Sequence, residues 1–312
     1  FTPDDVFYAV AGVHRRVKGA YAVVTLISDR GIVAFRDPMG IRPLCFGTRV
    51  IDGKTETMVA SESVALDSAG FKLERDILPG EAIFIDINGK IHTRLCTKES
   101  GYTPCIFEFV YFARPDTQLY TQSVHHARVR MGQSLAQQAP AEADVVMGVP
   151  ESGIPAAEGY AKEINIPYAQ GLVKNRYIGR TFIAPNQELR SLGVRMKLNP
   201  LRDTIEGNRL VVVDDSIVRG TTTKAMVRML REAGAKEIHM RISSPPYRWP
   251  CFYGMDTGTQ SELLASNLTV QEIEDYLDVD SLSYLTLDRL VEATGTSNAG
   301  FCSACLTGEY PV

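Results

Sequence analysis

A pair of adjacent aspartates at the end of an apolar run is the most chemically suggestive feature of this 312-residue sequence. Asp214 and Asp215 follow the run 209–213, and a loop with one glycine and three threonines follows them at residues 216–223. Backbone N–H groups and the dipole at a helix start are suited to binding a phosphate monoester. Two carboxylates beside such an anion site suit the hydroxyls of a ribose and a hydrated Mg²⁺ ion. The pattern therefore predicts a sugar-phosphate site.

A strand that ends in a capped helix is the purely structural alternative, because Asp and Thr are common capping residues. For Thr221 alone that alternative is the better interpretation. For the whole run 211–223, with two acids, a glycine that permits close backbone approach and three hydroxyls, the functional interpretation is favoured. Ligands of open α/β sheets bind at the carboxyl ends of strands, which is where this run places the acids.

The segments around this loop alternate between strand and helix. Apolar runs at 144–149, 209–213 and 237–242 predict strands, and the stretches that end near 163 and 233 predict helices. Strands that are buried on both faces and alternate with helices indicate a doubly wound parallel sheet. An apolar strand is also expected directly after residue 105, and short helices with acidic turns from residue 261 onward.

The first hundred residues have a different pattern. Short β-branched segments separated by turn residues predict strands at 19–28, 31–35, 57–60 and 81–87. No crossover helix fits between them, so an antiparallel sheet is expected, with a short helix at 61–69. The opening Thr-Pro-Asp-Asp at 2–5 predicts a helix start. Because the chain opens at Phe1 without an initiator methionine, we expect it to begin partway through a domain.

Composition narrows the class of protein. Apolar residues make up 45% of the chain, charged residues 22%, and the formal net charge is −4, which excludes a disordered or rod-like chain. The length suggests about two domains, and the balanced charge argues against a bulk nucleic-acid or membrane-surface binder. No apolar run approaches the roughly 20 residues of a membrane span and no leader pattern precedes the chain, so a cytoplasmic protein is expected.

The run 211–223 resembles the phosphoribosyl pyrophosphate (PRPP) signature of type I phosphoribosyltransferases. This resemblance implies that Asp214 and Asp215 lie along the ribose and its metal. It also implies a loop around the 5-phosphate, formed by Ser216, Arg219, Gly220, Thr221, Thr222 and Thr223.

Further motifs resemble one branch of that group, the glutamine PRPP amidotransferases of purine synthesis. They are a basic run at 174–183 and the segments 35–44, 60–63, 111–116 and 149–152, in the family's order. A basic run is usually a solvated face, but beside a pyrophosphate site it suits a closing loop whose cations meet the leaving group. The resemblance implies that Ser152 joins the two acids around one Mg²⁺ per subunit. It also implies that Lys174, Tyr177 and Arg180 close the site and line an ammonia path.

Four of the six cysteines have a spacing that suits a metal centre. Cys302 and Cys305 form a CxxC pair, and Cys105 and Cys251 are distant from it in sequence. The residues alone leave three alternatives open: a zinc site, an iron–sulfur cluster, or core thiols at Cys105 and Cys251. One branch of the family carries a [4Fe–4S] cluster on cysteines in this order, so the resemblance implies these four as ligands, with a structural or oxygen-sensing role.

The family's glutaminase uses an N-terminal cysteine nucleophile, and this chain opens with Phe1 instead. The resemblance therefore implies that the nucleophile and the glutamine pocket are absent from the chain. Cys45 and Cys96 stand at the ends of expected strands, where small buried thiols are common, and are not candidates to replace it.

These observations together predict an α/β and α+β chain of three parts. They are the later part of an N-terminal-nucleophile glutaminase domain (1–100), a type I phosphoribosyltransferase domain (101–258) and a C-terminal helical segment with the CxxC pair (259–312). The resemblance implies an amidophosphoribosyltransferase, a pentosyltransferase that makes 5-phosphoribosylamine, pyrophosphate and glutamate from PRPP and glutamine, in the first step of purine synthesis. This chain is expected to use ammonia at best.

The resemblance further implies a homo-oligomer inhibited by purine nucleotides. Two alternatives remain. A salvage phosphoribosyltransferase would explain the acid pair but not the β-rich first part or the cysteines. A PRPP-sensing regulator would need a DNA-binding surface, and the sequence has no helix-turn-helix pattern or basic stripe.

Overall fold

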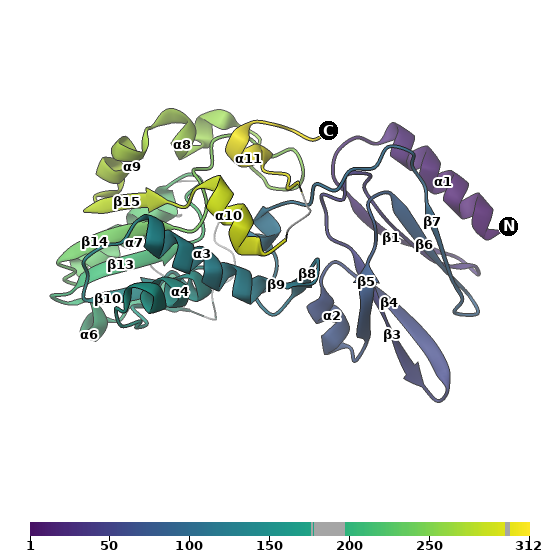
Figure 1. Cartoon of the computed structure of the whole chain (residues 1–312), viewed down its shortest axis with the longest axis horizontal. Helices are drawn as coiled ribbons and strands as arrows, with labels where there is room; N and C mark the ends of the chain where they lie inside the picture. The colour runs from purple at the N-terminus through teal and green to yellow at the C-terminus, as the bar shows by residue number, and fades with distance from the viewer. Residues whose placement is uncertain (176, 178–196, 297–299) are drawn as a thin grey trace.

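The computed structural model describes residues 1–175, 177, 197–296 and 300–312. Figure 1 shows an N-terminal unit of antiparallel sheets, in purple and blue, beside a larger α/β unit in teal, green and yellow. The first helix, α1 (Pro3–Arg16), begins where the sequence predicted. The Asp5 carboxylate accepts a hydrogen bond from the Thr2 backbone N–H at 2.7 Å, which closes a capping box and lowers the pKa of Asp5.

The N-terminal unit consists of two stacked antiparallel sheets, so the predicted antiparallel pairing is confirmed. One sheet has the order β1 (Ala22–Ile27), β2 (Gly31–Arg36), β6 (Glu81–Asp86), β7 (Ile91–Leu95). The other has the order β4 (Lys54–Ala60), β3 (Cys45–Ile51), β5 (Lys72–Asp76), with α2 (Ser63–Ser68) beside it. Helix α1 packs on the outer face of the first sheet through Phe7 and Val10, and Ala34, Phe46 and Ile83 pack between the two sheets.

The larger unit is built on a four-stranded sheet whose strands all run parallel. Its order is β10 (Val145–Gly148), β13 (Arg209–Asp214), β14 (Glu237–Ile242), β15 (Ser281–Tyr284). The first three strands and their parallel pairing confirm the sequence prediction. Strand β15 was not predicted, because the segment from residue 261 was expected to hold only short helices. Its Ser-Leu-Ser-Tyr alternation is too short to stand out, and pairing with β14 makes it an edge strand.

Helices cover both faces of this parallel sheet. Helices α3 (Val124–Gln138) and α4 (Ile154–Ile164) lie on one face, and α7 (Thr221–Glu232) and α9 (Val270–Leu277) lie on the other. The two helices α3 and α4 touch closely, because a Cβ on Gly132 would come within 1.8 Å of the Ala156 carbonyl oxygen. Neighbouring residues of β13 contribute to opposite cores, with Val211 facing α4 and Val212 facing α7.

Short elements connect these layers. The expected strand after Cys105 is instead a π-helix, η1 (Glu108–Phe112), so that prediction was wrong. An apolar run of this length does not by itself distinguish a strand from a buried helical turn. The remaining elements within the described residues are β8 (Gln118–Leu119), β9 (Gln122–Ser123), β11 (Leu172–Lys174), β12 (Leu198–Pro200), α6 (Arg202–Ile205), η2 (Gln260–Glu262), α8 (Leu264–Asn267), α10 (Leu287–Thr294) and α11 (Ala304–Thr307).

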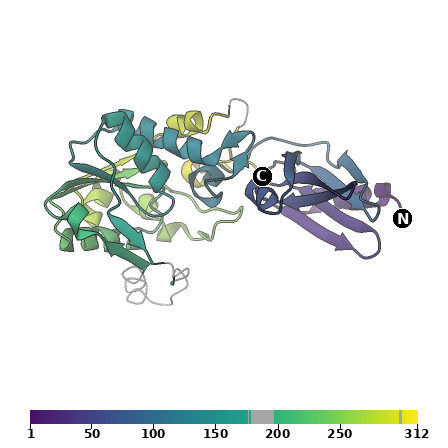
Figure 2. The same ribbon diagram turned by 90° about the horizontal axis from the view of Figure 1, so that it is seen from below.

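Two arginines from the N-terminal unit bind the larger unit. The Arg42 guanidinium donates to the Tyr253 carbonyl oxygen at 2.7 Å and to the Glu108 carboxylate at 2.9 Å. Burial raises the pKa of Glu108 and the charge of Arg42 opposes that rise. The fully buried Arg36 donates to the Tyr120 hydroxyl at 3.0 Å. Figure 2 shows a narrow junction between the two units, with the C-terminal end of the chain beside it.

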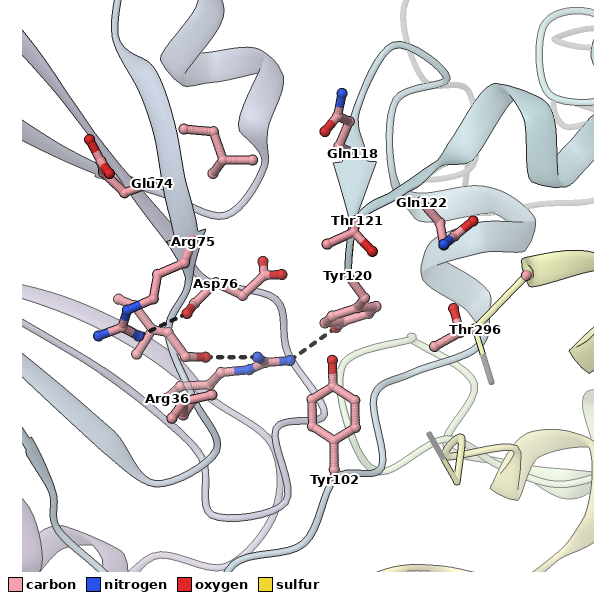
Figure 3. A pocket seen from close by; sticks show the side chains of 14 residues that line it. Arg36, Glu74, Arg75, Asp76, Tyr102, Gln118, Tyr120, Thr121, Gln122 and Thr296 are labelled. Atoms are coloured by element: carbon pink, nitrogen blue, oxygen red, sulfur yellow. Dashed lines mark hydrogen bonds between the residues drawn. The ribbon is translucent and has the colours of Figure 1, made fainter. Parts of the chain in front are cut away.

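A cavity of about 560 Å³ lies at the same junction (Figure 3). Arg36 and Asp76 line it from the N-terminal unit, and Tyr102, Tyr120 and Thr296 line it from the other side. The two adjacent aspartates and the four cysteines of the predicted metal centre are not among the described residues that line it. The cavity is therefore separate from the predicted sugar-phosphate site.

The described residues contain no helix that is both long and apolar enough to cross a membrane.

Candidate active site

The two aspartates stand at the carboxyl edge of the parallel sheet, as the sequence predicted. Asp214 is the last residue of β13, and its carboxylate accepts a hydrogen bond from the Asp215 backbone N–H at 2.9 Å. The Asp215 carboxylate is buried and accepts from the hydroxyls of Ser152 at 2.6 Å and Ser216 at 2.5 Å. Ser152 thus lies beside the acid pair, although it stands 63 positions earlier in the chain.

The turn between β10 and α4 carries Ser152 to this position. The Val149 backbone N–H donates to the Val213 carbonyl oxygen at 2.9 Å, which fastens the turn to β13. Gly153 is required there, because a Cβ would come within 2.4 Å of the same oxygen. The Pro150–Glu151 peptide bond in this turn is cis. The Glu151 carboxylate binds the Lys174 ammonium at 3.3 Å, so Lys174 lies at the same edge of the sheet.

Burial raises the pKa of both aspartates. For Asp214 the largest cause is burial, and the neighbouring Asp215 charge raises the pKa further. For Asp215 burial is again the largest cause, while hydrogen bonds from Ser152 and Ser216 and the charge of Arg128 lower the pKa. Two carboxylates this close resist carrying two negative charges. A cation or a set of donor hydroxyls that binds between them therefore gains from relieving that repulsion.

The loop after the acids closes onto the start of α7. Gly220 has φ +74°, a conformation that favours glycine, and it forms the N-cap of the helix. Thr221 and Thr222 are at least partly exposed, whereas Thr223 is buried, so the loop presents two hydroxyls and the free N–H groups of the first turn. Those groups, with the exposed Arg219, can surround an anion of the size of a phosphate monoester.

The predicted closing loop lies mostly outside the described residues. Lys174 ends β11 at the same edge of the sheet as the acid pair, where it contacts Glu151, and Tyr177 is 98% exposed. Arg180 lies outside the described residues, as does most of the basic segment that continues to residue 197.

Sequence reasoning missed one buried cation near the site. Arg128 of α3 is 4% exposed and donates to the carbonyl oxygens of Phe109 and Ala113, both at 2.8 Å. Its charge favours the ionised form of Asp215. The sequence did contain a sign of this buried charge, because Arg128 interrupts the apolar face of α3 that contains Val124 and Met131. A charge on the buried stripe of a helix needs partners, and these are supplied by η1.

Three separate chain segments bring the predicted cluster cysteines together. The Cys302 backbone N–H donates to the Pro104 carbonyl oxygen at 2.9 Å, so the CxxC pair lies beside Cys105. The Trp249 N–H donates to the Cys305 carbonyl oxygen at 3.0 Å, which brings the Cys251 loop alongside. Burial raises the pKa values of Cys105, Cys302 and Cys305, and the charges of the other three cysteines raise the pKa of Cys305 further. Within the described ranges, no three His, Cys, Asp or Glu side chains are arranged to hold a single metal ion.

Comparison with known proteins first defines the class. The family model for the phosphoribosyl transferase domain matches residues 117–243, which contain the acid pair and its loop. The chain is also 48% identical over 304 residues to the amidophosphoribosyltransferase of Synechococcus elongatus, covering 97% of this chain and 61% of that protein. It is 46% identical over 310 residues to the enzyme of the same name from Archaeoglobus fulgidus, covering 99% of this chain and 66% of that protein.

A solved structure agrees with these relatives. The glutamine PRPP amidotransferase from B. subtilis, complexed with ADP and GMP, superposes with a TM-score of 0.88 and 46% identity, over 100% of this chain and 67% of that one. The chain belongs to the amidophosphoribosyltransferase family. It spans about three fifths of the length of the Synechococcus relative.

Proposed function

We propose that this chain carries the phosphoribosyl-transfer half of an amidophosphoribosyltransferase. In that reaction ammonia forms a bond to C1 of PRPP while the bond from C1 to pyrophosphate breaks, and 5-phosphoribosylamine results. In the longer protein, glutamine would supply the ammonia and become glutamate, in the first step of purine synthesis. The observation that carries the proposal is the Ser152–Asp215 hydrogen bond of 2.6 Å beside Asp214 and the phosphate loop.

Each residue has a role that its geometry suits. Asp214 and Asp215 would accept hydrogen bonds from ribose hydroxyls and, with Ser152, hold Mg²⁺, which neutralises pyrophosphate charge when bound. The backbone from Ser216 to Thr223 would bind the 5-phosphate. The Lys174 ammonium at the same edge would meet the pyrophosphate. No general base is needed in this scheme, because positioning and neutralisation of the leaving group lower the barrier.

Residues 1–100 would be the later part of the glutaminase domain, residues 101–258 the transferase and residues 259–312 the C-terminal segment. An uncovered apolar face supports the first of these assignments. Val24 and Leu26 of β1 are 54% and 75% exposed, although their strand neighbour Ala34 is fully buried on the same face. An apolar face of this kind calls for another layer, and the rest of the same domain in the longer protein is the occupant we propose.

The proposal assigns no glutaminase nucleophile to this chain. Cys45 and Cys96 are buried at strand ends. Burial raises the pKa of Cys45 to about 12, which leaves almost no reactive thiolate near neutral pH. Phe1 offers no thiol.

A [4Fe–4S] cluster on Cys105, Cys251, Cys302 and Cys305 is the second part of the proposal. The support is that the three chain segments that carry these cysteines lie beside one another, with Cys105, Cys302 and Cys305 buried and Cys251 half-buried. A multi-iron cluster on four thiolates would serve as a rigid structural link between these segments. Iron and inorganic sulfide, about four of each per chain after anaerobic purification, would support it, whereas zinc without sulfide would contradict it.

Purine nucleotides are the proposed inhibitors, and a homo-oligomer is the proposed assembly. The support is the B. subtilis protein, whose solved structure is complexed with ADP and GMP. Inhibition of pyrophosphate release by ADP with GMP, together with the mass in solution, tests both.

The experiment that tests the reaction compares nitrogen sources. With PRPP and Mg²⁺, the chain should release pyrophosphate with ammonia, more at alkaline pH where NH₃ replaces NH₄⁺, and not with glutamine. Release with a nucleobase instead of ammonia would support a salvage phosphoribosyltransferase. A sample that binds PRPP but uses glutamine would contradict the absence of a glutaminase site.

A further inference from the structure

A segment from the C-terminal part of the chain covers the outside of the phosphate loop. The Leu264 backbone N–H donates to the Val218 carbonyl oxygen at 2.9 Å. The Leu264 side chain lies against Gly220, where an added Cβ would come within 2.5 Å of its Cδ2. The loop therefore does not stand free, because residues 256–264 form its outer wall.

One ion pair joins this wall to the loop itself. The Arg219 guanidinium donates through Nε to the Glu262 carboxylate at 2.8 Å, and its second nitrogen lies 2.7 Å from the same oxygen. Arg219 also donates to the Asp256 carbonyl oxygen at 3.4 Å. Both side chains of the pair are about half exposed. The only basic side chain of the loop is thus held by a carboxylate on the wall.

We propose that the Glu262 carboxylate competes with the ligand for Arg219: it holds Arg219 at the rim of the phosphate loop and yields it when the 5-phosphate of a ribose phosphate binds. This inference rests on the proposed function, since it assumes that the loop binds that phosphate. A guanidinium binds carboxylates and phosphates with the same paired geometry, so the two anions compete for Arg219.

The energetic balance makes such an exchange feasible. An exposed ion pair is worth little, because both charges remain solvated, whereas a phosphate monoester offers a larger negative charge and three acceptor oxygens. Release from Glu262 therefore costs less than a new contact with phosphate gains. The carboxylate keeps Arg219 close to the loop and weakens phosphate binding slightly.

Calorimetric titration with ribose 5-phosphate, at one fixed ionic strength, tests the proposal. Glu262→Gln should bind about two- to five-fold more tightly than the unchanged chain, the range set by a surface ion pair. Arg219→Gln should bind about ten-fold or more weakly. In the Arg219→Gln background, Glu262→Gln should have no effect, because the carboxylate acts only through Arg219.

A matched control is available on α7. Glu232→Gln removes the same charge from another exposed ion pair, with Arg228 at 2.9 Å, at the far end of the helix that starts at the loop. Glu232→Gln should leave the affinity for ribose 5-phosphate unchanged. The effect of Glu262→Gln would then come from its contact with Arg219 and not from the loss of one negative charge in general.

Three results would overturn the inference: equal affinity of Glu262→Gln and the unchanged chain, weaker binding by Glu262→Gln, or an equal gain in the Arg219→Gln background. Weaker binding would mean that Glu262 only orders the wall. Failure of the unchanged chain to bind PRPP with Mg²⁺ would instead overturn the proposed function, so the two failures are distinguishable.

Discussion

Each unit of the molecule buries an aspartate carboxylate, and the two carboxylates are satisfied in different ways. In the N-terminal unit, the fully buried Asp37 accepts hydrogen bonds of 3.0–3.3 Å from the backbone N–H groups of Tyr21, Met39, Ile41 and Arg42. In the larger unit, Asp215 accepts from two side-chain hydroxyls, those of Ser152 and Ser216. Backbone N–H donors keep their direction as long as the turn is folded. Hydroxyl groups can rotate away, so a ligand can take their place on the carboxylate.

This difference distinguishes a structural carboxylate from one that is available to a ligand. A carboxylate has about four acceptor positions, and in Asp37 four backbone donors occupy them. The Asp215 carboxylate accepts hydrogen bonds from two rotatable hydroxyls, and burial raises its pKa. It therefore retains capacity for ribose hydroxyls or a cation.

The largest effect is expected at the acid pair. Replacing Asp214→Asn and Asp215→Asn together should weaken PRPP and Mg²⁺ binding by more than about 100-fold, because several charged hydrogen bonds of about 1.5–3 kcal/mol are lost. The melting temperature should stay equal or rise, since burial disfavours both charges. Calorimetric titration and thermal unfolding measure the two quantities. Affinity close to that of the unchanged chain would refute the site assignment.

The next effect concerns the cysteine centre beside the junction of the two units. Cys302→Ser should remove iron and sulfide from the protein and loosen the C-terminal segment, because one of four proposed ligands is lost. Elemental analysis and hydrogen exchange in residues 300–312 are the measurements. Cys96→Ser, a buried thiol in the N-terminal unit, is the control and should keep its iron. Equal iron in both variants would contradict the ligand assignment.

Asp37→Asn should have the opposite effects to the substitutions at the acid pair, because it should lower stability without lowering PRPP affinity. An amide can accept through one oxygen only, so the turn 37–42 should lose about 2–4 kcal/mol of stability. PRPP affinity of the folded protein should not change. Urea unfolding gives the first value, with the exposed Asp67→Asn as the control. A variant that kept its stability but lost PRPP binding would reverse the assignment of the two carboxylates.

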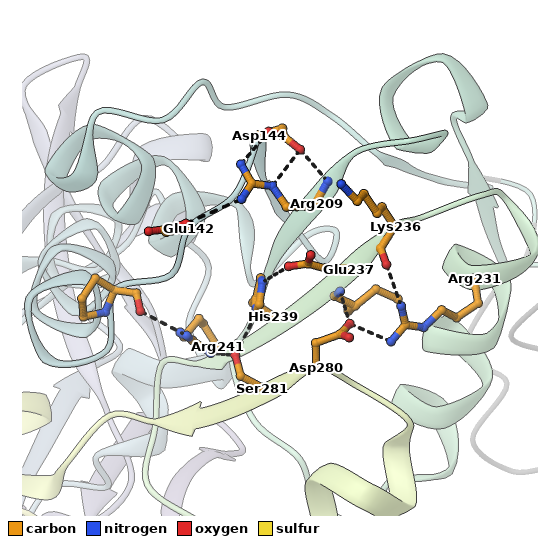
Figure 4. Close-up of polar contacts among 12 residues, drawn as sticks. Glu142, Asp144, Arg209, Arg231, Lys236, Glu237, His239, Arg241, Asp280 and Ser281 are labelled. Atoms are coloured by element: carbon orange, nitrogen blue, oxygen red, sulfur yellow. Dashed lines mark hydrogen bonds and ion pairs between the residues drawn. The ribbon is translucent and has the colours of Figure 1, made fainter.

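The smallest effect is expected at the amino-terminal edge of the parallel sheet, where Arg209 begins β13, whereas Asp214 ends the same strand. Figure 4 shows the contact of Asp144 with Arg209. Asp144 binds the Arg209 guanidinium at 3.0 Å and the Arg209 N–H at 2.8 Å, and these bonds lower its pKa to about 2. Because the pKa of Asp144 is lower in the folded protein than the unfolded value of 3.8, its ionised carboxylate stabilises the folded protein above that pH. This stabilisation is lost as the pH falls through about 2. Asp144→Asn should therefore be slightly less stable at neutral pH, and the difference should shrink as the pH falls from 3.8 and vanish below pH 2. A difference that persisted there would exclude the ion pair as its source.

The local patterns of the sequence determined several features correctly. The helix start at Thr2, the antiparallel first unit and the three strands β10, β13 and β14 follow from capping residues, turn residues and apolar periodicity, which act over a few neighbouring residues. The acid pair could be assigned to the carboxyl edge of the sheet for the same reason, because a strand and the loop after it are continuous in the chain.

Tertiary structure alone decided which distant groups surround that edge. The Ser152–Asp215 hydrogen bond spans 63 positions, and the family resemblance, not a local pattern, suggested it. Arg128, the wall residue Glu262 and strand β15 came from other segments, and η1 is a π-helix where a strand was expected. Short apolar runs fit more than one backbone conformation. Which one forms, and which carboxylate keeps room for a ligand, depends on donors that only packing brings into contact.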